Sequence, residues 1–181
     1  MNALRILHDE IKTCTKCPLY HSRKNSVPGE GPVDAKVIFV GEAPGAKEDE
    51  LGRPFVGRSG ALLTELLKNI GLSRSEVFIT SVLKSRPPKN RTPTKREVKA
   101  CMPYLRRQFE IINPKLIVLL GGVAVSSIIG PWKLLEAHGR FCEGSGRTYF
   151  ITYHPAAALR FPKIRTKMVD DFKILKKELQ L

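Results

Sequence analysis

Runs of consecutive apolar residues alternate along this chain with segments in which apolar residues recur every three or four positions. The runs predict buried β-strands, because strands covered on both faces are continuously apolar. They span residues 36–40, 77–83, 115–120 and 149–153. The helical periods and their capping residues predict helices over 1–12, 60–70, 95–112, 123–129 and 163–179. Residues 41–60 are expected to form a long loop, and 132–147 an irregular stretch with one weak strand.

The starts of two helices are marked by capping residues. Ser59 is expected to cap the helix over 60–70, which ends before Gly71. Thr94 and Glu97 have the spacing of a capping box for the helix that ends near Ile112.

Strands that alternate with helices predict an α/β fold. We expect a three-layer sandwich with a central, mainly parallel four-stranded sheet flanked by helices. The 181 residues suit one domain over 1–181. Ligands bind beyond the carboxyl ends of parallel strands, so the Gly41–Gly45 loop, the segment from Ser81 and His154 are expected to meet there.

The charge of the chain points to a polyanionic partner. Lys and Arg number 31 against 17 Asp and Glu, which gives a net charge of +14. Residues 84–99 hold seven basic side chains opposed only by Glu97, and strand-like runs flank them, so they predict a basic loop that binds nucleic acid. These are Lys84, Arg86, Lys89, Arg91, Lys95, Arg96 and Lys99.

The N-terminal segment is a helix pattern with two acidic residues, Asp9 and Glu10, and does not resemble a signal peptide. No apolar run approaches the ~20 residues that span a bilayer. We therefore expect a cytoplasmic protein that does not enter a membrane, and we expect a monomer.

Four cysteines are present: Cys14, Cys17, Cys101 and Cys142. Without a secretory signal, a disulfide framework is not expected. The Cys14–Cys17 spacing points to metal or redox chemistry, but structural zinc needs four ligands and an iron–sulfur cluster usually needs four cysteines. Two alternatives stay open on spacing alone: Cys101 as a free thiol in the core, and a zinc-binding nucleic-acid protein. Cys142 is interpreted as unpaired.

Three segments carry candidate chemistry, and each has a plainer interpretation. The Gly41–Gly45 loop lets a ligand approach the backbone, or is simply a turn. Phe55 stacks on a planar ligand, or belongs to the core. His154 polarises a leaving oxygen, or is structural. The small apolar stretch that follows, up to Arg160, is either a probe that enters a duplex or the start of a helix.

Six motifs in fixed order resemble the family-4 uracil-DNA glycosylases, the iron–sulfur type of thermophilic archaea and bacteria. The resemblance covers nearly the whole chain, and the joint match is highly specific. The motifs are CTKCPL at 14–19, PGEG at 28–31, VGEAPG with its acidic tail at 40–50, GRPFVGRSGALL at 52–63, KSRPPKNRTPT at 84–94 and HPAAALR at 154–160.

The resemblance implies an enzyme of DNA base-excision repair that flips uracil out of DNA and hydrolyses its N-glycosidic bond, leaving an abasic site. It implies catalytic roles for Glu42, Glu48 and His154, with His154 donating a hydrogen bond to the uracil O2. It implies that Gly41, Ala43, Gly45, Phe55 and Ser81 bind the substrate. It implies DNA contacts by Arg86, Lys89, Arg91, Ala158, Leu159 and Arg160, and an iron–sulfur subsite in segments 14–17 and 85–101.

Two positions depart from the family pattern, which usually reads TNVVKCRPP where this chain reads TSVLKSRPP at 80–88. Ser81 replaces the Asn that reads the uracil edge, so we expect weaker uracil discrimination, with deaminated purines as further candidate substrates. Ser85 replaces a cluster cysteine beside Cys14, Cys17 and Cys101. Three outcomes stay open: a [4Fe–4S] cluster with Ser85 or solvent as fourth ligand, a labile three-iron cluster, or no cluster. Cys142 lies too far along the chain to be chosen.

The same residues also allow a second class of function. A glycosylase-like scaffold could bind DNA or damaged bases without turnover, and the changes at Ser81 and Ser85 favour that interpretation. The retained Glu42, Phe55 and His154 oppose it, because a decayed pocket would be expected to lose them first. We therefore favour the enzyme.

Overall fold

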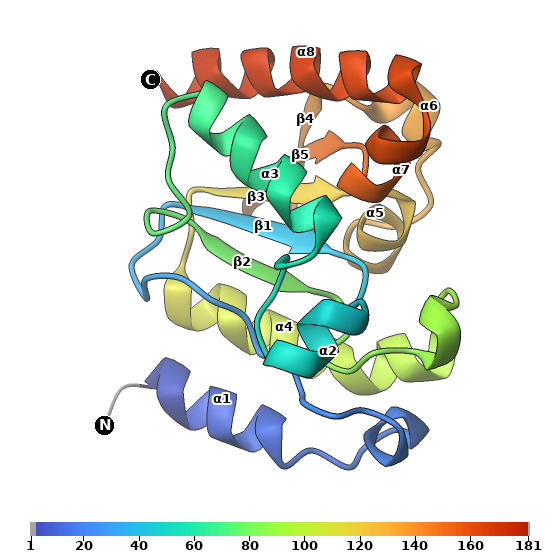
Figure 1. The fold of residues 1–181 in the computed structure, drawn as a ribbon. Coiled ribbons are helices and arrows are strands. Elements are labelled where there is room, and N and C mark those ends of the chain that lie inside the picture. Colours follow the sequence, from blue (N-terminus) through green and yellow to red (C-terminus); the bar gives the residue numbers. More distant parts are fainter. Residues whose placement is uncertain (1–2, 181) are drawn as a thin grey trace.

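The protein is described here by a computed structural model that covers residues 3–180, and a five-stranded sheet forms its centre (Figure 1). The strand order is β2-β1-β3-β5-β4, and only β4 runs antiparallel to its neighbour. The expected α/β fold with a mainly parallel sheet is confirmed, and the weak strand expected within 132–147 is β4, which makes the fifth. The strands are β1 (Val37–Gly41), β2 (Phe78–Ser81), β3 (Leu116–Leu120), β4 (Arg140–Gly144) and β5 (Arg147–Thr152).

Helices cover both faces of the sheet, as Figure 1 shows. The helices α3, α7 and α8 pack on one face, α4 and α5 pack on the other, and α1 lies against the outer side of α4. The α-helices are α1 (Ala3–Lys12), α2 (Ala46–Leu51), α3 (Arg58–Asn69), α4 (Lys95–Ile112), α5 (Gly122–Ile128), α6 (Leu134–Ala137), α7 (Pro155–Arg160) and α8 (Pro162–Leu179). Two 3₁₀ turns, η1 (Pro18–His21) and η2 (Pro88–Asn90), lie in the connections.

The apolar strand runs supply two cores, one on each side of the sheet. Phe39 and Val118 face α3 and α8, whereas Ile38 and Ile117 face α4, and all four are fully buried. Alternate residues of a strand point to opposite faces, which is why both faces are apolar. Each such side chain stabilises the fold by about 1.5–3 kcal/mol relative to exposure.

Helix starts agree with the sequence in one case and differ in another. The capping box of α4 is confirmed: Thr94 Oγ1 accepts a hydrogen bond from the Glu97 N–H, and the Glu97 carboxylate accepts one from the Thr94 N–H. Helix α3, however, begins at Arg58 and its N-cap is Gly57, so Ser59 is not the cap.

The expected loop over 41–60 contains the short helix α2, which the sequence pattern missed. Its N-cap is Gly45, it ends at Leu51, and its C-cap Gly52 has φ +68. The expected strand over 77–83 ends at Ser81, and the chain leaves the sheet there while staying buried as far as Ser85.

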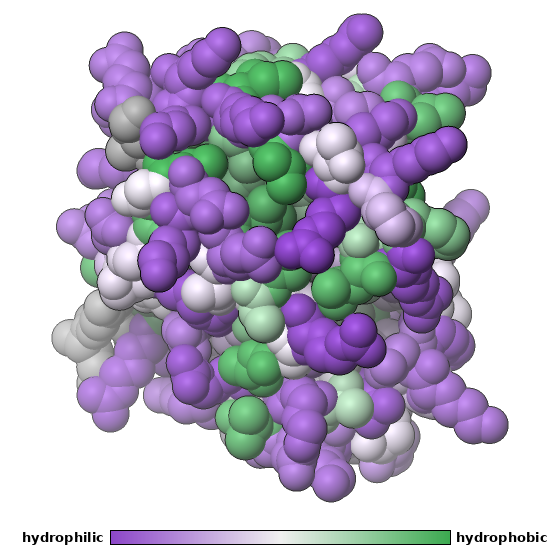
Figure 2. Space-filling view, turned by 45° about the horizontal axis from the view of Figure 1, so that its top comes forward, coloured by the Kyte–Doolittle hydropathy of each residue, from purple (hydrophilic) through white to green (hydrophobic). Residues whose placement is uncertain are grey.

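The amphipathic N-terminal helix is confirmed over Ala3–Lys12, with Leu4, Leu7 and Ile11 buried; the first two residues of the expected range lie outside the described residues. Among residues 3–180, no helix is long and apolar enough to cross a membrane. Hydrophilic side chains predominate on the face shown in Figure 2, and hydrophobic ones form small separate groups there.

Candidate functional site

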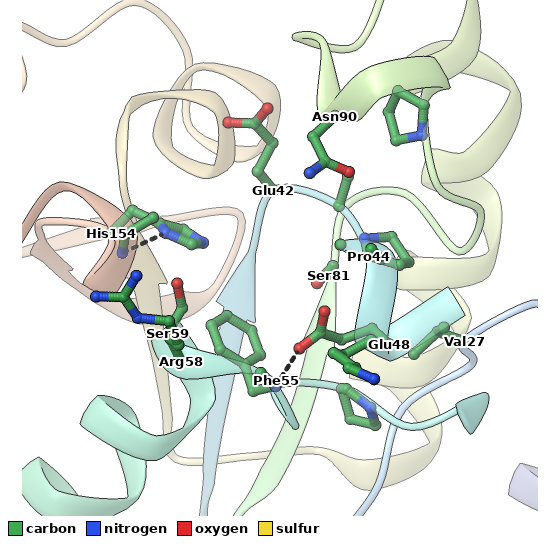
Figure 3. A pocket seen from close by; sticks show the side chains of 18 of the residues that line it. Val27, Glu42, Pro44, Glu48, Phe55, Arg58, Ser59, Ser81, Asn90 and His154 are labelled. Carbon is green, nitrogen blue, oxygen red and sulfur yellow. Dashed lines mark hydrogen bonds between the residues drawn. The ribbon is translucent and has the colours of Figure 1, made fainter. Parts of the chain in front are cut away.

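A cavity of about 530 Å³ opens at the carboxyl edge of the parallel strands. Gly41 ends β1, Ser81 ends β2, and His154 follows β5 by two residues. The loop after β1 and the side chains of Ser81 and His154 line this cavity, so the expected convergence of the strand ends is confirmed. Figure 3 shows these side chains directed into one space.

His154 presents one particular nitrogen to the cavity. Its Nδ1 accepts a hydrogen bond of 3.1 Å from the Ala156 N–H at the start of α7, so the neutral ring carries its proton on Nε2. Burial lowers the pKa of His154 from 6.5 to about 4. A Cβ atom on Gly121 would lie 2.9 Å from the His154 Cβ, so this glycine allows the histidine its position. His154 is therefore a neutral hydrogen-bond donor at neutral pH.

Phe55 forms a wall of the cavity opposite His154. The two ring centroids lie 5.7 Å apart, and the Phe55 ring sits on Gly41, where a Cβ atom would lie 2.5 Å from it. The core interpretation of Phe55 is confirmed, and because the ring also lines the cavity, its stacking on a ligand stays a prediction. A planar ligand could stack on this ring.

Glu48 fixes the loop that carries Phe55. Its Oε1 accepts hydrogen bonds of 2.8 Å from the N–H groups of both Val56 and Gly57. Its Oε2 lies so close to Gly45 that a Cβ there would be 2.8 Å away. A role as a merely solvated acid is thus excluded for Glu48. The neighbouring Asp49 is also buried, and it accepts a hydrogen bond from a backbone N–H of the 21–25 segment.

Glu42 lies on another part of the cavity wall, beside Asn90 in Figure 3. Burial raises the pKa of its carboxyl group. Ala43 and Gly45 complete the loop and present no carboxylate of their own. Glu42 and Glu48 are therefore the two carboxylates of the 41–48 segment that line the cavity.

Ser81 contributes a short hydroxyl to the cavity, and its backbone is held from below. The Ser81 carbonyl accepts a hydrogen bond of 2.7 Å from Lys84 Nζ, which also donates to Thr80 Oγ1 at 2.5 Å and to Gln108 Oε1 at 2.8 Å. Lys84 is fully buried, and burial lowers its pKa to about 7. The prediction that Lys84 belongs to a basic loop that binds nucleic acid is therefore wrong, since its side chain does not face solvent.

Of the remaining basic side chains of that segment, Arg91 lines the cavity, whereas the last three lie on α4, so only part of the segment is a loop. Lys89 is exposed, Arg86 donates from Nε to Asn90 Oδ1 at 2.7 Å, and Arg91 pairs with Glu97 at 2.6 Å. Arg91 and Arg160 both line the cavity.

The segment after His154 forms the helix α7, so of the two interpretations, a probe that enters a duplex and the start of a helix, the second is confirmed. Ala158 is 3% exposed and packs in the core, which excludes it as a DNA-contacting residue in this arrangement. Leu159 and Arg160 are exposed on α7.

Sequence reasoning missed Asn90, Arg58 and Val27, which also line the cavity. Asn90 has φ +55 and ends the turn that follows two prolines. In the sequence, those prolines indicated only a loop. Arg58 and Val27 come from segments whose path over the sheet edge no local pattern reveals.

A second, smaller cavity brings together Cys14, Cys17, Ser85 and Cys101 between α1 and α4. Cys101 Sγ accepts from the Lys84 N–H at 3.3 Å, and the Ser85 hydroxyl accepts from Arg23 Nη1 at 2.9 Å. Within residues 3–180, no three Cys, His, Asp or Glu side chains are placed to hold a single metal ion. Cys142 lies away from this cavity, on β4.

Comparison with known proteins agrees with this geometry. Residues 28–179 match the model of the uracil DNA glycosylase superfamily. A type-4 uracil-DNA glycosylase of Pyrobaculum aerophilum is 48% identical over 93% of this chain and 90% of its own length. Enzymes of the same name from Sulfurisphaera tokodaii (46% identical; 96% and 83% covered) and Thermotoga maritima (46%; 87% and 83%) are also similar. The chain therefore belongs to the uracil-DNA glycosylase superfamily and is a member of its type-4 family.

Proposed function

We propose that this protein excises uracil from DNA in base-excision repair, flipping the nucleotide into the cavity and hydrolysing its N-glycosidic bond to leave an abasic site. The observation that carries the proposal is the neutral His154, whose Nε2–H is free of the helix cap and faces the cavity opposite Phe55. A flipped base stacked on Phe55 would bring a carbonyl oxygen to this donor.

The chemistry follows from the charge that develops on the leaving base. As the bond between the sugar C1′ and the base nitrogen breaks, its electron pair stays on the base, which leaves as an anion. A preorganised N–H aimed at the base oxygen stabilises that charge. A neutral imidazole suits this role, because the pKa of about 4 leaves it uncharged at neutral pH.

Water must then add to C1′ and lose a proton. Ala43 offers no carboxylate to activate it, so Glu42 and Glu48 are the candidates for orienting water or stabilising the sugar cation. Glu48 keeps one oxygen on the Val56 and Gly57 amides, which leaves the other for the substrate. Gly45 lines the cavity and leaves room for the Glu48 carboxylate, whereas Gly41, expected to bind the substrate, is outside the lining and leaves room for the Phe55 ring.

Ser81 sets the breadth of base recognition in this proposal. An Asn amide would match the N3–H and O4 groups of uracil together, whereas one hydroxyl serves only one of them well. An unpaired buried group costs about 1–3 kcal/mol, which corresponds to about 10- to 100-fold weaker discrimination. Hypoxanthine and xanthine are therefore candidate substrates beside uracil.

The DNA would approach over the basic rim of the cavity. Arg91 and Arg160 line the cavity, and their sequence neighbours Arg86, Lys89 and Leu159 would join them in phosphate or groove contacts. We infer that the chain acts as a monomeric single domain over 1–181, since the cavity is complete within one copy.

The cysteine cavity suits an iron–sulfur subsite. Three thiols and the Ser85 hydroxyl line the same small cavity, and a backbone N–H already donates to Cys101 Sγ, as such donors do to cluster sulfur. In a cluster each cysteine binds its own iron, so its ligands lie further apart than those of a single ion. Cys14, Cys17 and Cys101 would hold it, with Ser85 or solvent as fourth ligand, and it would tie α1 to α4.

Iron analysis and visible absorbance of protein purified without oxygen test the subsite. We expect cluster absorbance that fades in air, and a slower loss in the Ser85→Cys variant, because thiolate binds iron more favourably than an alkoxide does. If the protein purified without oxygen is well folded but contains no iron, the iron–sulfur subsite is excluded.

The activity is tested with oligonucleotides that carry uracil, hypoxanthine or xanthine, followed by alkaline cleavage of abasic sites. Uracil DNA should be cleaved, and Ser81→Asn should raise its kcat/KM by about 10- to 100-fold while lowering any activity on the purines. Equal uracil rates in both proteins would overturn the role of Ser81. Binding without any cleaved product would show the chain to be a DNA-binding module instead.

A further inference from the structure

Phe55, whose ring lines the cavity, has a backbone conformation that residues other than glycine rarely adopt. Its φ is +50, in the left-handed region. Such a conformation is strained and persists only where neighbours enforce it. A Cβ on Gly60 would lie 1.8 Å from the Phe55 carbonyl oxygen, so the helix start packs directly on this carbonyl.

Arg74 is the side chain that holds the carbonyls on either side of the strained residue. It lies in the turn between α3 and β2, outside the lining of the cavity. Its Nη1 donates to the Phe55 carbonyl at 2.9 Å, and its Nη2 donates to the Pro54 carbonyl at 2.8 Å. One planar guanidinium therefore sets the peptide planes before and after Phe55.

Glu48 holds the opposite side of the same loop. It accepts from the next two backbone amides, those of Val56 and Gly57, at 2.8 Å each. Arg74 therefore holds two carbonyls of this loop, and Glu48 holds two of its amides. These four hydrogen bonds leave the loop little freedom to turn Phe55 away from His154.

Arg53 provides a matched comparison for Arg74. Both arginines contact Glu30: Arg53 Nε lies 2.7 Å and Arg74 Nη2 lies 3.8 Å from its carboxylate. The Arg53 side chain is 59% exposed against 20% for Arg74, and it donates hydrogen bonds to the Glu30 carboxylate rather than to the loop carbonyls.

We propose that Arg74 is a positioning residue for catalysis, which acts by holding Phe55 in the conformation that stacks on the flipped base. The inference rests on the proposed function, because it needs Phe55 to receive a base. Arg74 touches neither the base nor the sugar, and its effect on turnover passes through Phe55.

The test is a double-mutant cycle on uracil-containing DNA with Arg74→Met, Phe55→Leu and both together. Arg74→Met should lower kcat/KM by roughly 10- to 100-fold, since small misplacements of a substrate group have effects of that size. The kcat/KM of Arg74→Lys should fall between those of Arg74→Met and the wild type, because a lysine ammonium can replace part of the hydrogen bonding of the guanidinium. Arg53→Met should stay within about twofold of the wild type.

In the Phe55→Leu background, Arg74→Met should change the rate by less than about twofold, since residues that act as a unit are not additive. A full Arg74 effect in that background would overturn the proposal, because a loss of general stability would persist there.

Amide hydrogen exchange gives a readout that does not depend on turnover. The Val56 and Gly57 amides should exchange faster in Arg74→Met than in Arg53→Met. Equal exchange in the two variants would also overturn the proposal. If the wild type cleaves no uracil DNA, the proposed function fails instead, and the exchange measurement alone decides whether Arg74 holds the loop.

Discussion

His154 combines two tasks in one ring, since Nδ1 caps α7 and Nε2–H faces the cavity. His154→Asn separates them, because asparagine is a good N-cap but its shorter side chain does not bring a donor to the same place. We expect kcat on uracil DNA to fall by about 100- to 1,000-fold, the usual effect of losing one such donor, with the thermal midpoint little changed. Single-turnover rates and thermal unfolding check both parts. Wild-type turnover in His154→Asn would contradict the assignment.

The lowered pKa of His154 also predicts how stability depends on pH. Its pKa is about 4 in the folded protein against 6.5 ordinarily, so the unfolded chain binds the extra proton between these values. Stability from this group is therefore complete above about pH 6.5 and is lost as the pH falls toward 4. Denaturant unfolding at about pH 7 and pH 5 should show a smaller decrease for His154→Asn than for the wild type. An equal decrease would contradict a neutral, buried imidazole.

At the scale of elements, the capping box sets where α4 begins. Thr94→Ala removes the hydrogen bond to the Glu97 N–H and should lower the free energy of unfolding by about 1 kcal/mol. Thr92→Ala, at an exposed position two residues earlier, is the control and should change it by less than about 0.5 kcal/mol. Equal values from denaturant titrations would argue that the cap contributes nothing.

The elements also show what the sequence can and cannot predict. Strands β1 and β3 followed from apolar runs, and α4 followed from its capping box, because these signals are local. Helix α2 was missed because its one buried residue is Asp49, so it has no apolar period. That Ser81 and His154 line one cavity was predicted because ligands bind beyond the carboxyl ends of parallel strands.

Contacts between distant loops gave no such signal. The bonds from Arg74 to the Phe55 loop join positions 19 and 20 residues apart, through a turn whose direction only packing decides. The burial of Lys84 was missed for the same reason: its charge suggested solvent, whereas three oxygen acceptors hold it inside.

Across the whole molecule, the net charge of +14 does not act as one uniform field. Several basic side chains outside the cavity lining are already matched within the protein, such as Lys12 by Asp9 and Lys173 by Asp170. Burial removes Lys84 from the surface. The charge available to DNA therefore depends on position, and residues at the cavity mouth should contribute more than those on the far helices.

Salt dependence of DNA binding measures that difference directly. Binding should weaken steeply from roughly 50 to 200 mM salt, because each Lys or Arg on a phosphate releases counterions. Lys89→Gln, at the exposed turn beside the cavity, should reduce the slope of log affinity against log salt by about 0.7–0.9, the value of one phosphate contact. Lys173→Gln, on α8 and 2.8 Å from Asp170, removes the same formal charge and should leave the slope unchanged. If both variants lower it equally, DNA senses only net charge, and the cavity mouth is not the place where it binds.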